Sequence, residues 1–275
     1  MTMGARLLKR LCFIFIFPLL ITACATSPLG RKQMILVPDE TMNKMGAQAF
    51  AQMKAQQPIE GSPRVRDYIA CIVTPLTLSA QAGVPNWEVV VFRSEDANAF
   101  ALPGGKIGVY TGLLKVAKTD AQLAAVIGHE IGHVVAHHGA ERVSQQAGTQ
   151  LGLSALGMVT KNNPNRDLLV GLLGVGAQFG ILLPFSRTQE SEADLIGLEL
   201  MAKAGFDPQA SVELWRNMIA SAKGAAPPEW LSTHPASENR ISNLQKHMPD
   251  AMTKFRQAQA DQHFPSCDRS LLSGV

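Results

Sequence analysis

The residues best suited to chemistry lie in the pattern His129-Glu130-x-x-His133, which occurs once in the 275 residues. Histidines four residues apart lie on one face of a helix, so both imidazoles could bind a single Zn²⁺ ion. Glu130 lies next to the first of these ligands and could take a proton from water as a general base. Apolar residues flank the motif on both sides, as is typical of a buried helix. The pattern therefore predicts one zinc ion per chain rather than two incidental surface histidines.

A catalytic zinc site needs a third protein ligand, and this motif supplies only two. The metzincin pattern would require a glycine and a histidine where this chain has Ala136 and Gly139, so it does not apply. His137 follows His133 by four residues, but on a continuous helix it could not easily complete a tetrahedral site with both other histidines. We therefore expect His137 and His138 at the surface or beside the ligands.

The acidic segment Glu190-Ser191-Glu192-Ala193-Asp194 supplies a better candidate. Together with the histidine motif, this segment resembles the gluzincin peptidases of the CAAX-prenyl-protease and HtpX type. The resemblance implies that Glu190 is the third zinc ligand and that Asp194 hydrogen-bonds a ligand histidine. Glu192 is a rival ligand, but its side chain points about 200° around the helix from Glu190. Residues four apart share a helix face, which favours Glu190 together with Asp194.

A second segment of the same resemblance covers Asn98, Ala99, Phe100 and Ala101, with the Leu-Pro-Gly-Gly that follows them. The resemblance implies an edge strand beside the zinc that holds extended substrate through backbone hydrogen bonds. The alternative is a hairpin with a structural role only.

A third segment, Thr233-His234-Pro235 with Arg240 further on, also resembles the family. The resemblance implies that His234 either hydrogen-bonds the oxyanion formed during hydrolysis or occupies the zinc as a latch when substrate is absent. Arg240 would then brace this loop. A loop that only begins a helix, without chemistry, is the alternative.

The first 23 residues predict a lipoprotein signal peptide. Three basic residues precede a short apolar run that contains Pro18, and the run is too short to span a membrane. It ends in Ile-Thr-Ala before Cys24, which resembles the bacterial lipobox, so we expect cleavage there and lipid on Cys24. Ala25, in place of an aspartate, favours the outer membrane with the domain facing the periplasm. An ordinary cleavage site with an incidental cysteine is the alternative.

The composition excludes several classes of protein. With 46% hydrophobic and 17% charged residues, the chain is too apolar for intrinsic disorder. The signal peptide holds three of the 25 basic residues and none of the 22 acidic ones, so the net charge of +3 disappears on cleavage. Nothing therefore favours nucleic acid as a partner.

Cysteine usage fits an oxidising compartment. Cys12 leaves with the signal peptide and Cys24 carries lipid, so Cys71 and Cys267 remain. In the periplasm we expect these two to form a disulfide. Two buried free thiols are the alternative.

The pattern of elements predicts an α+β fold, a mostly helical zincin-like domain over residues 38–275 with a small β-sheet or hairpin beside the active-site helix. Residues 24–37 would form a lipidated tether. The apolar run 168–183 is short for a membrane span and suits a buried helix better. Helices are expected at 38–57, 62–81, 119–140 and 188–204, from 208 and after 235, and strands at 87–93, 97–102 and 106–110.

The sequence as a whole predicts a zinc endopeptidase of the bacterial cell envelope. The CAAX-type and HtpX enzymes are integral membrane proteins, whereas this chain resembles the lipoprotein, LoiP-like periplasmic branch. That resemblance implies quality control of misfolded or unassembled outer-membrane and periplasmic proteins. One alternative is a latched or structural zinc protein that assists outer-membrane assembly as a chaperone. Another is a membrane-embedded protease that uses residues 168–183.

Overall fold

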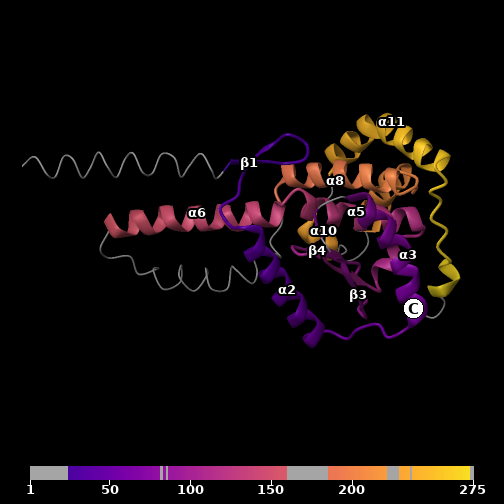
Figure 1. Cartoon of the computed structure of the whole chain (residues 1–275), viewed down its shortest axis with the longest axis horizontal. Coiled ribbons are helices and arrows are strands. Elements are labelled where there is room, and N and C mark those ends of the chain that lie inside the picture. Colours follow the sequence, from indigo (N-terminus) through magenta and orange to yellow (C-terminus); the bar gives the residue numbers. More distant parts are fainter. Residues whose placement is uncertain are drawn as a thin grey trace, which may run out of the picture.

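The computed structural model describes residues 24–80, 83–84, 86–159, 185–221, 229–235 and 237–272. Helices surround a small three-stranded sheet in this part of the chain, which confirms the predicted α+β class (Figure 1). The apolar run 168–183 lies outside the described residues. Within the described ranges, no helix has both the length and the apolar character needed to cross a membrane.

The three-stranded sheet contains β3 (Glu88–Phe92), β4 (Ala99–Leu102) and β5 (Lys106–Tyr110) in the order β3-β5-β4. The central strand β5 is parallel to β3 and antiparallel to β4. The predicted hairpin is thus confirmed, and its turn uses Gly104 and Gly105 at φ values of 80° and 72°, which favour glycine. This order leaves β4 at an edge of the sheet.

The predicted helices lie close to their predicted ranges, with one exception described below. The helices at Leu113–Val116, His138–Val159 and Glu229–Thr233 were not predicted. Pro63 is the first residue of α3, as expected for a proline at a helix start. The helical segments are α2 (Asp39–Gln56), α3 (Pro63–Ala80), α4 (Leu113–Val116), α5 (Asp120–Val135), α6 (His138–Val159), α8 (Arg187–Lys203), α9 (Gln209–Ser221), α10 (Glu229–Thr233), α11 (Glu238–Ala260) and the 3₁₀ helix η1 (Arg269–Leu272).

The helix that carries the histidine motif begins as predicted but ends earlier. The Thr119 hydroxyl accepts a hydrogen bond from the Gln122 backbone N–H at 3.1 Å and caps the start of α5. The predicted continuation to residue 140 is wrong, because the helix stops at Val135 and His137 adopts a φ of 52°. A new helix, α6, begins at His138, so His137 and His138 do not continue the face of the motif.

The predicted tether at residues 24–37 is instead folded onto the domain. Strands β1 (Cys24–Thr26) and β2 (Lys32–Met34) pair antiparallel, and we call residues 24–34 the N-terminal hairpin. The buried Gln33 side chain donates to the carbonyl of Ala136 at 2.6 Å, just beyond the end of α5. The backbone N–H of Leu36 donates to the Ser144 hydroxyl at 2.8 Å. The first contact fixes the hairpin at the end of α5, and the second fixes the segment after the hairpin against α6.

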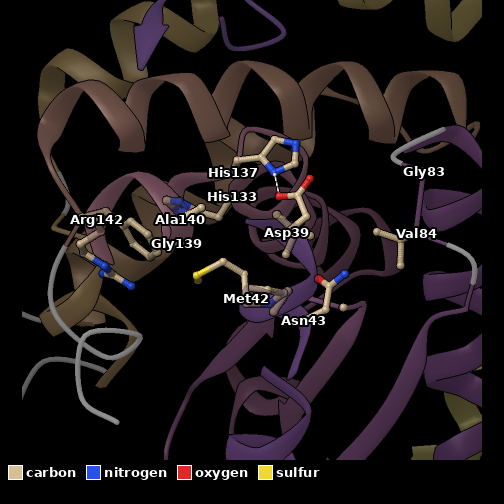
Figure 2. A pocket seen from close by; sticks show the side chains of 15 residues that line it. Asp39, Met42, Asn43, Gly83, Val84, His133, His137, Gly139, Ala140 and Arg142 are labelled. Carbon is tan, nitrogen blue, oxygen red and sulfur yellow. Dashed lines mark ion pairs between the residues drawn. The ribbon is translucent and has the colours of Figure 1, made fainter. Parts of the chain in front are cut away.

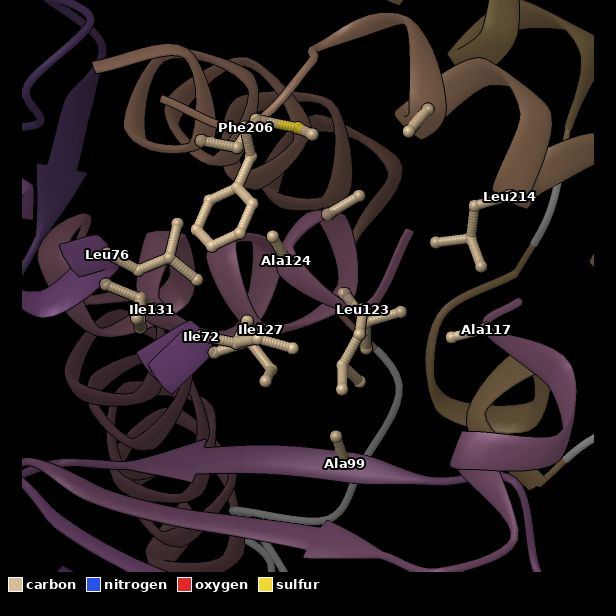
Figure 3. Packing of buried hydrophobic residues seen from close by; sticks show 14 of the residues in the cluster. Ile72, Leu76, Ala99, Ala117, Leu123, Ala124, Ile127, Ile131, Phe206 and Leu214 are labelled. Atoms are coloured by element: carbon tan, nitrogen blue, oxygen red, sulfur yellow. The ribbon is translucent and has the colours of Figure 1, made fainter. Parts of the chain in front are cut away.

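The core surrounds α5. Figure 3 shows Leu123 and Ile127 of α5 packed near Ile72 of α3 and Phe206, with Ala99 of β4 facing them. From Gln122 to His133, every residue of α5 is buried. The motif therefore lies on a helix enclosed on all sides, which restricts the movement of its side chains.

The C-terminal segment is attached beside the start of α5. Cys71 of α3 and Cys267 form a disulfide across a separation of 196 residues. Arg269 donates to the backbone carbonyls of Leu114 and Ala117 at 2.8 and 2.6 Å. The tail thus closes over the segment that leads into the motif helix.

Candidate metal centre

Two helices, α5 and α8, supply the residues of the site, and glycines let them pack closely. A Cβ atom on Gly132 would lie 2.8 Å from the carbonyl oxygen of Ala193, and one on Gly197 would lie 2.7 Å from the backbone nitrogen of His129. Larger residues at these positions would separate the helices. The close approach brings side chains of α8 within reach of the α5 histidines.

Four buried side chains converge at this crossing: His129, His133, Glu190 and His234. The Nε2 atoms of the two motif histidines are 3.0 Å apart, and Glu190 oxygens lie 3.6 Å from His129 Nε2 and 3.4 Å from His133 Nε2. Zinc bonds of about 2.0–2.1 Å in a tetrahedron place ligand atoms about 3.3–3.4 Å apart. The observed separations therefore fit one zinc ion.

Burial opposes charge in this cluster, yet Glu190 stays ionised. Burial lowers the pKa of His133 well below its ordinary value. Burial alone would raise the pKa of Glu190, but hydrogen bonds with His133 and His234 and the nearby imidazoles lower it. Glu190 Oε2 forms an ion pair with Arg240 Nη1 at 2.6 Å. An ionised carboxylate beside buried imidazoles is a donor set that suits a divalent cation.

Asp194 fixes the outer nitrogen of His129, the role that the resemblance implied. Asp194 Oδ1 lies 3.0 Å from His129 Nδ1. Arg240 donates two hydrogen bonds of 2.6 Å to the same carboxylate and stacks at 3.8 Å over the Trp215 ring. Burial would raise the pKa of Asp194, but the charge of Arg240 and its hydrogen bonds lower it. An ionised Asp194 keeps the His129 proton on Nδ1, which leaves Nε2 free for a metal.

Glu130 has a partner that sequence reasoning missed. The Trp230 indole N–H donates to Glu130 Oε1 at 2.7 Å, and His234 Nε2 lies 3.4 Å from the same oxygen. Burial would lower the pKa of His234, but the charges of Glu130 and Glu190 raise it. Trp230 and Glu130 are 100 residues apart, so no local sequence pattern could have predicted this contact.

His137, His138 and the rival acid Glu192 have distinct positions. His137 is exposed and lies 3.3 Å from Asp39, whereas His138 is fully buried with its Nδ1 2.9 Å from His133 Nδ1. Glu192 lies outside the cluster of four and contacts His138 at 3.2 Å. Burial would raise the pKa of Glu192, but hydrogen bonds with neighbours including His138 lower it to about 2.

Arg240 does contact the loop that it was expected to brace. It donates to the Pro235 carbonyl at 3.2 Å in addition to its bonds with Asp194. Sequence reasoning also missed Phe185, whose ring stacks on that of His133 with centroids 3.7 Å apart.

The free edge of β4 lies near the metal cluster. The Tyr110 N–H donates to the Asn98 carbonyl at 3.0 Å, so in this antiparallel pair Phe100 also bonds to β5. Ala99 and Ala101 then point their backbone N–H and C=O groups away from β5. Ala101 is partly exposed and could pair with an extended peptide through these groups, whereas Ala99 is buried. Asn98 and Phe100 direct their backbone groups towards β5.

A cavity of about 170 Å³ opens beside His133. Figure 2 shows Asp39, Met42 and Asn43 of α2 on one side of it and Arg142 on the other. Ala101 of β4 also lines this cavity. It therefore joins the metal cluster to the free strand edge and has room for a side chain of a bound peptide.

Comparison with known proteins agrees with this arrangement. The sequence profile of peptidase family M48 matches residues 63–248. The mitochondrial metalloendopeptidase OMA1 of Schizosaccharomyces pombe is 40% identical over 174 residues, and the mitochondrial metalloendopeptidase OMA1 of Bos taurus is 43% identical over 176. The beta-barrel assembly-enhancing protease of Yersinia pestis is 31% identical over 206 residues. The alignments cover 61%, 61% and 72% of this chain but 48%, 33% and 42% of those proteins, so the chain spans about half of their length or less.

Substitution of Gly132 by alanine should disturb the helix crossing on which the site depends. The added Cβ would meet the Ala193 carbonyl, so we expect a loss of about 1–3 kcal/mol in the free energy of unfolding and weaker zinc binding. Denaturant unfolding and competition with a chelator measure the two effects. The control is Gly148→Ala on α6, where a Cβ would meet nothing closer than Met34 Cε at 3.5 Å. Unchanged zinc affinity in Gly132→Ala would show that the site tolerates wider helix spacing.

Proposed function

The chain belongs to peptidase family M48, and on that premise we propose that it is a zinc-dependent endopeptidase. The observation that carries the proposal is the buried convergence of His129, His133 and Glu190, with Glu130 beside them. These three side chains would hold one Zn²⁺ ion per chain. When bound, the ion would supply a Lewis acid that polarises the scissile carbonyl and makes a water molecule more acidic.

Glu130 is placed to move the proton. Both of its described contacts, with Trp230 and His234, involve Oε1, so Oε2 can accept a proton from water. The water oxygen bonds to the carbonyl carbon as Glu130 takes its proton, and Glu130 then returns this proton to the amide nitrogen as the C–N bond breaks. The reaction consumes one water and yields a carboxylic acid group and an amine. The Trp230 hydrogen bond keeps the carboxylate oriented throughout.

The free edge of β4 would bind the peptide. Backbone pairing along this edge, at Ala101, requires an extended segment but not a particular sequence. Such recognition suits unfolded or misassembled chains, in which extended segments are accessible. The cavity beside His133 would then receive one side chain of the bound segment.

The signal sequence supports a location for this activity. We propose that the chain is a lipoprotein of the LoiP-like kind, anchored in the outer membrane through lipid on Cys24 and facing the periplasm. Its substrates would be misfolded or unassembled envelope proteins. The similarity to the beta-barrel assembly-enhancing protease supports this reading, although proteins named as mitochondrial endopeptidases have higher identity to the chain.

A second candidate function has its own observation. His234 Nδ1 lies 3.1 Å from His129 Nε2 and 3.0 Å from a Glu190 oxygen, inside the ligand cluster. A zinc ion with His234 as fourth ligand would have no position for water. The chain would then be latched, acting as an assembly factor or chaperone until the loop that carries His234 moves.

Substitution of Glu130 by glutamine should abolish proteolysis while zinc stays bound. The amide keeps the shape of the side chain but cannot accept the proton, so we expect a loss of about 10²–10⁴-fold in the rate of cleavage of an unfolded porin or casein. Glu40→Gln, an exposed residue of α2, is the matched control. Full cleavage by Glu130→Gln would contradict the mechanism, and cleavage by the unaltered chain should stop when a chelator removes the metal.

Substitution of His234 by alanine separates the two roles of this residue. Because the ring lies within the ligand cluster, we expect removal to open a zinc position and raise the rate of proteolysis. His247→Ala on α11, whose ring contacts only the Asn243 carbonyl among the described hydrogen bonds, should leave the rate unchanged. A loss of about 10²–10³-fold in His234→Ala would instead identify His234 as an oxyanion donor.

Substitution of Cys24 by serine tests the anchor. Without the thiol no lipid can be attached, so we expect the protein to move from the outer-membrane fraction to the soluble periplasmic fraction. Fractionation followed by immunoblotting measures this. Retention of Cys24→Ser in the membrane would show that something other than lipid on Cys24 holds the protein there.

A further inference from the structure

The Nδ1 atoms of the two motif histidines, which face away from the proposed metal, have different kinds of partner. His129 Nδ1 contacts a carboxylate, Asp194, directly at 3.0 Å. His133 Nδ1 instead contacts a second imidazole, with His138 Nδ1 at 2.9 Å. His138 is fully buried, and its other nitrogen lies 3.2 Å from Glu192 Oε2. A carboxylate therefore reaches each motif histidine, directly in one case and through His138 in the other.

The positions of the protons in this chain follow from the metal site. A His133 that binds metal through Nε2 must carry its proton on Nδ1. That proton is donated to His138 Nδ1, so the proton of neutral His138 lies on Nε2 and is donated to Glu192. Every donor in the sequence His133, His138, Glu192 then faces an acceptor. An alternative tautomer of His138 would leave two N–H groups facing each other.

Glu192 is in turn held by the N-terminal hairpin. The Ser27 hydroxyl donates to Glu192 Oε1, and Arg31 Nε donates to Oε2 at 2.7 Å. The two Nη atoms of Arg31 donate to both oxygens of Glu141, each at 2.7 Å. Arg31 thus binds two buried carboxylates at once, in the planar geometry that its guanidinium favours.

We propose that the N-terminal hairpin positions the zinc ligand His133 by orienting Glu192, which orients His138. This inference rests on the proposed zinc site and assigns Glu192, Ser27 and Arg31 as positioning residues outside it. Partners of this kind fix the tautomer and the ring plane of a metal-binding histidine. The hairpin begins at Cys24, so the segment nearest the predicted anchor contacts the metal centre through only two intervening side chains.

The test measures the zinc affinity of the full chain by competition with a chromophoric chelator. Glu192→Gln keeps the contacts, because one amide oxygen can accept from both His138 and Arg31 while the amide N–H₂ faces the Ser27 hydroxyl. It removes only the charge, and we expect about tenfold weaker zinc binding. Ser27→Ala should weaken binding in the same direction by a smaller factor. Lys32→Gln, an exposed residue of the same hairpin, should leave the affinity unchanged.

A double-mutant cycle decides whether Glu192 acts through His138. If it does, adding Glu192→Gln to His138→Phe should cause no further loss of zinc affinity. Additive losses in this cycle would overturn the proposal. Where His138→Phe fails to fold, unchanged zinc affinity in both Glu192→Gln and Ser27→Ala would overturn it instead. A merely structural hairpin would lower the thermal stability of the zinc-free variants without changing zinc affinity. If the unaltered chain bound no zinc, the proposed function itself would fail, and that outcome is separate.

Discussion

The close contact between α5 and α8 is the constraint on which the rest of the site depends, because it buries acidic side chains that need partners. Where Gly132 faces Ala193 and Gly197 faces His129, the two helix backbones approach so closely that a Cβ would not fit, and the side chains of the cluster around them are buried. Carboxylates from α8 are thereby buried against imidazoles from α5. A buried carboxylate without partners destabilises a fold by several kcal/mol. The surrounding elements must therefore supply partners for each acidic side chain.

Two arginines from opposite ends of the chain meet this requirement. Arg240 of α11 pairs with Asp194, and Arg31 of the N-terminal hairpin pairs with Glu192. The two carboxylates are two residues apart on α8, so they point in different directions, and each meets its own arginine. This arrangement explains why Glu192 is buried and charged without being a ligand. It also shows that the site is braced on two sides by separate parts of the fold.

The sequence predicted what depends on local geometry. A spacing of four residues placed His129 with His133 and Glu190 with Asp194, because a helix brings such residues to one face whatever surrounds it. The helix end after Val135 could not be predicted in this way. The chain has no glycine or proline there, and the break coincides with a tertiary contact, from Gln33 to the Ala136 carbonyl. The Trp230–Glu130 contact and the folded hairpin in place of a tether likewise depend on residues far apart in sequence.

Arg240 lies inside the region that matches the family, whereas Arg31 and the rest of the N-terminal hairpin lie outside it. The match to peptidase family M48 begins at residue 63 and ends at 248, so it includes α5, α8 and Arg240 but not the N-terminal hairpin. The His129 side of the site is thus complete within the matched region. On the His133 side, His138 and Glu192 are within it, but the groups that orient Glu192 lie before it. The matched region therefore contains all the proposed ligands. The N-terminal hairpin lies outside it and reaches His133 through Glu192 and His138.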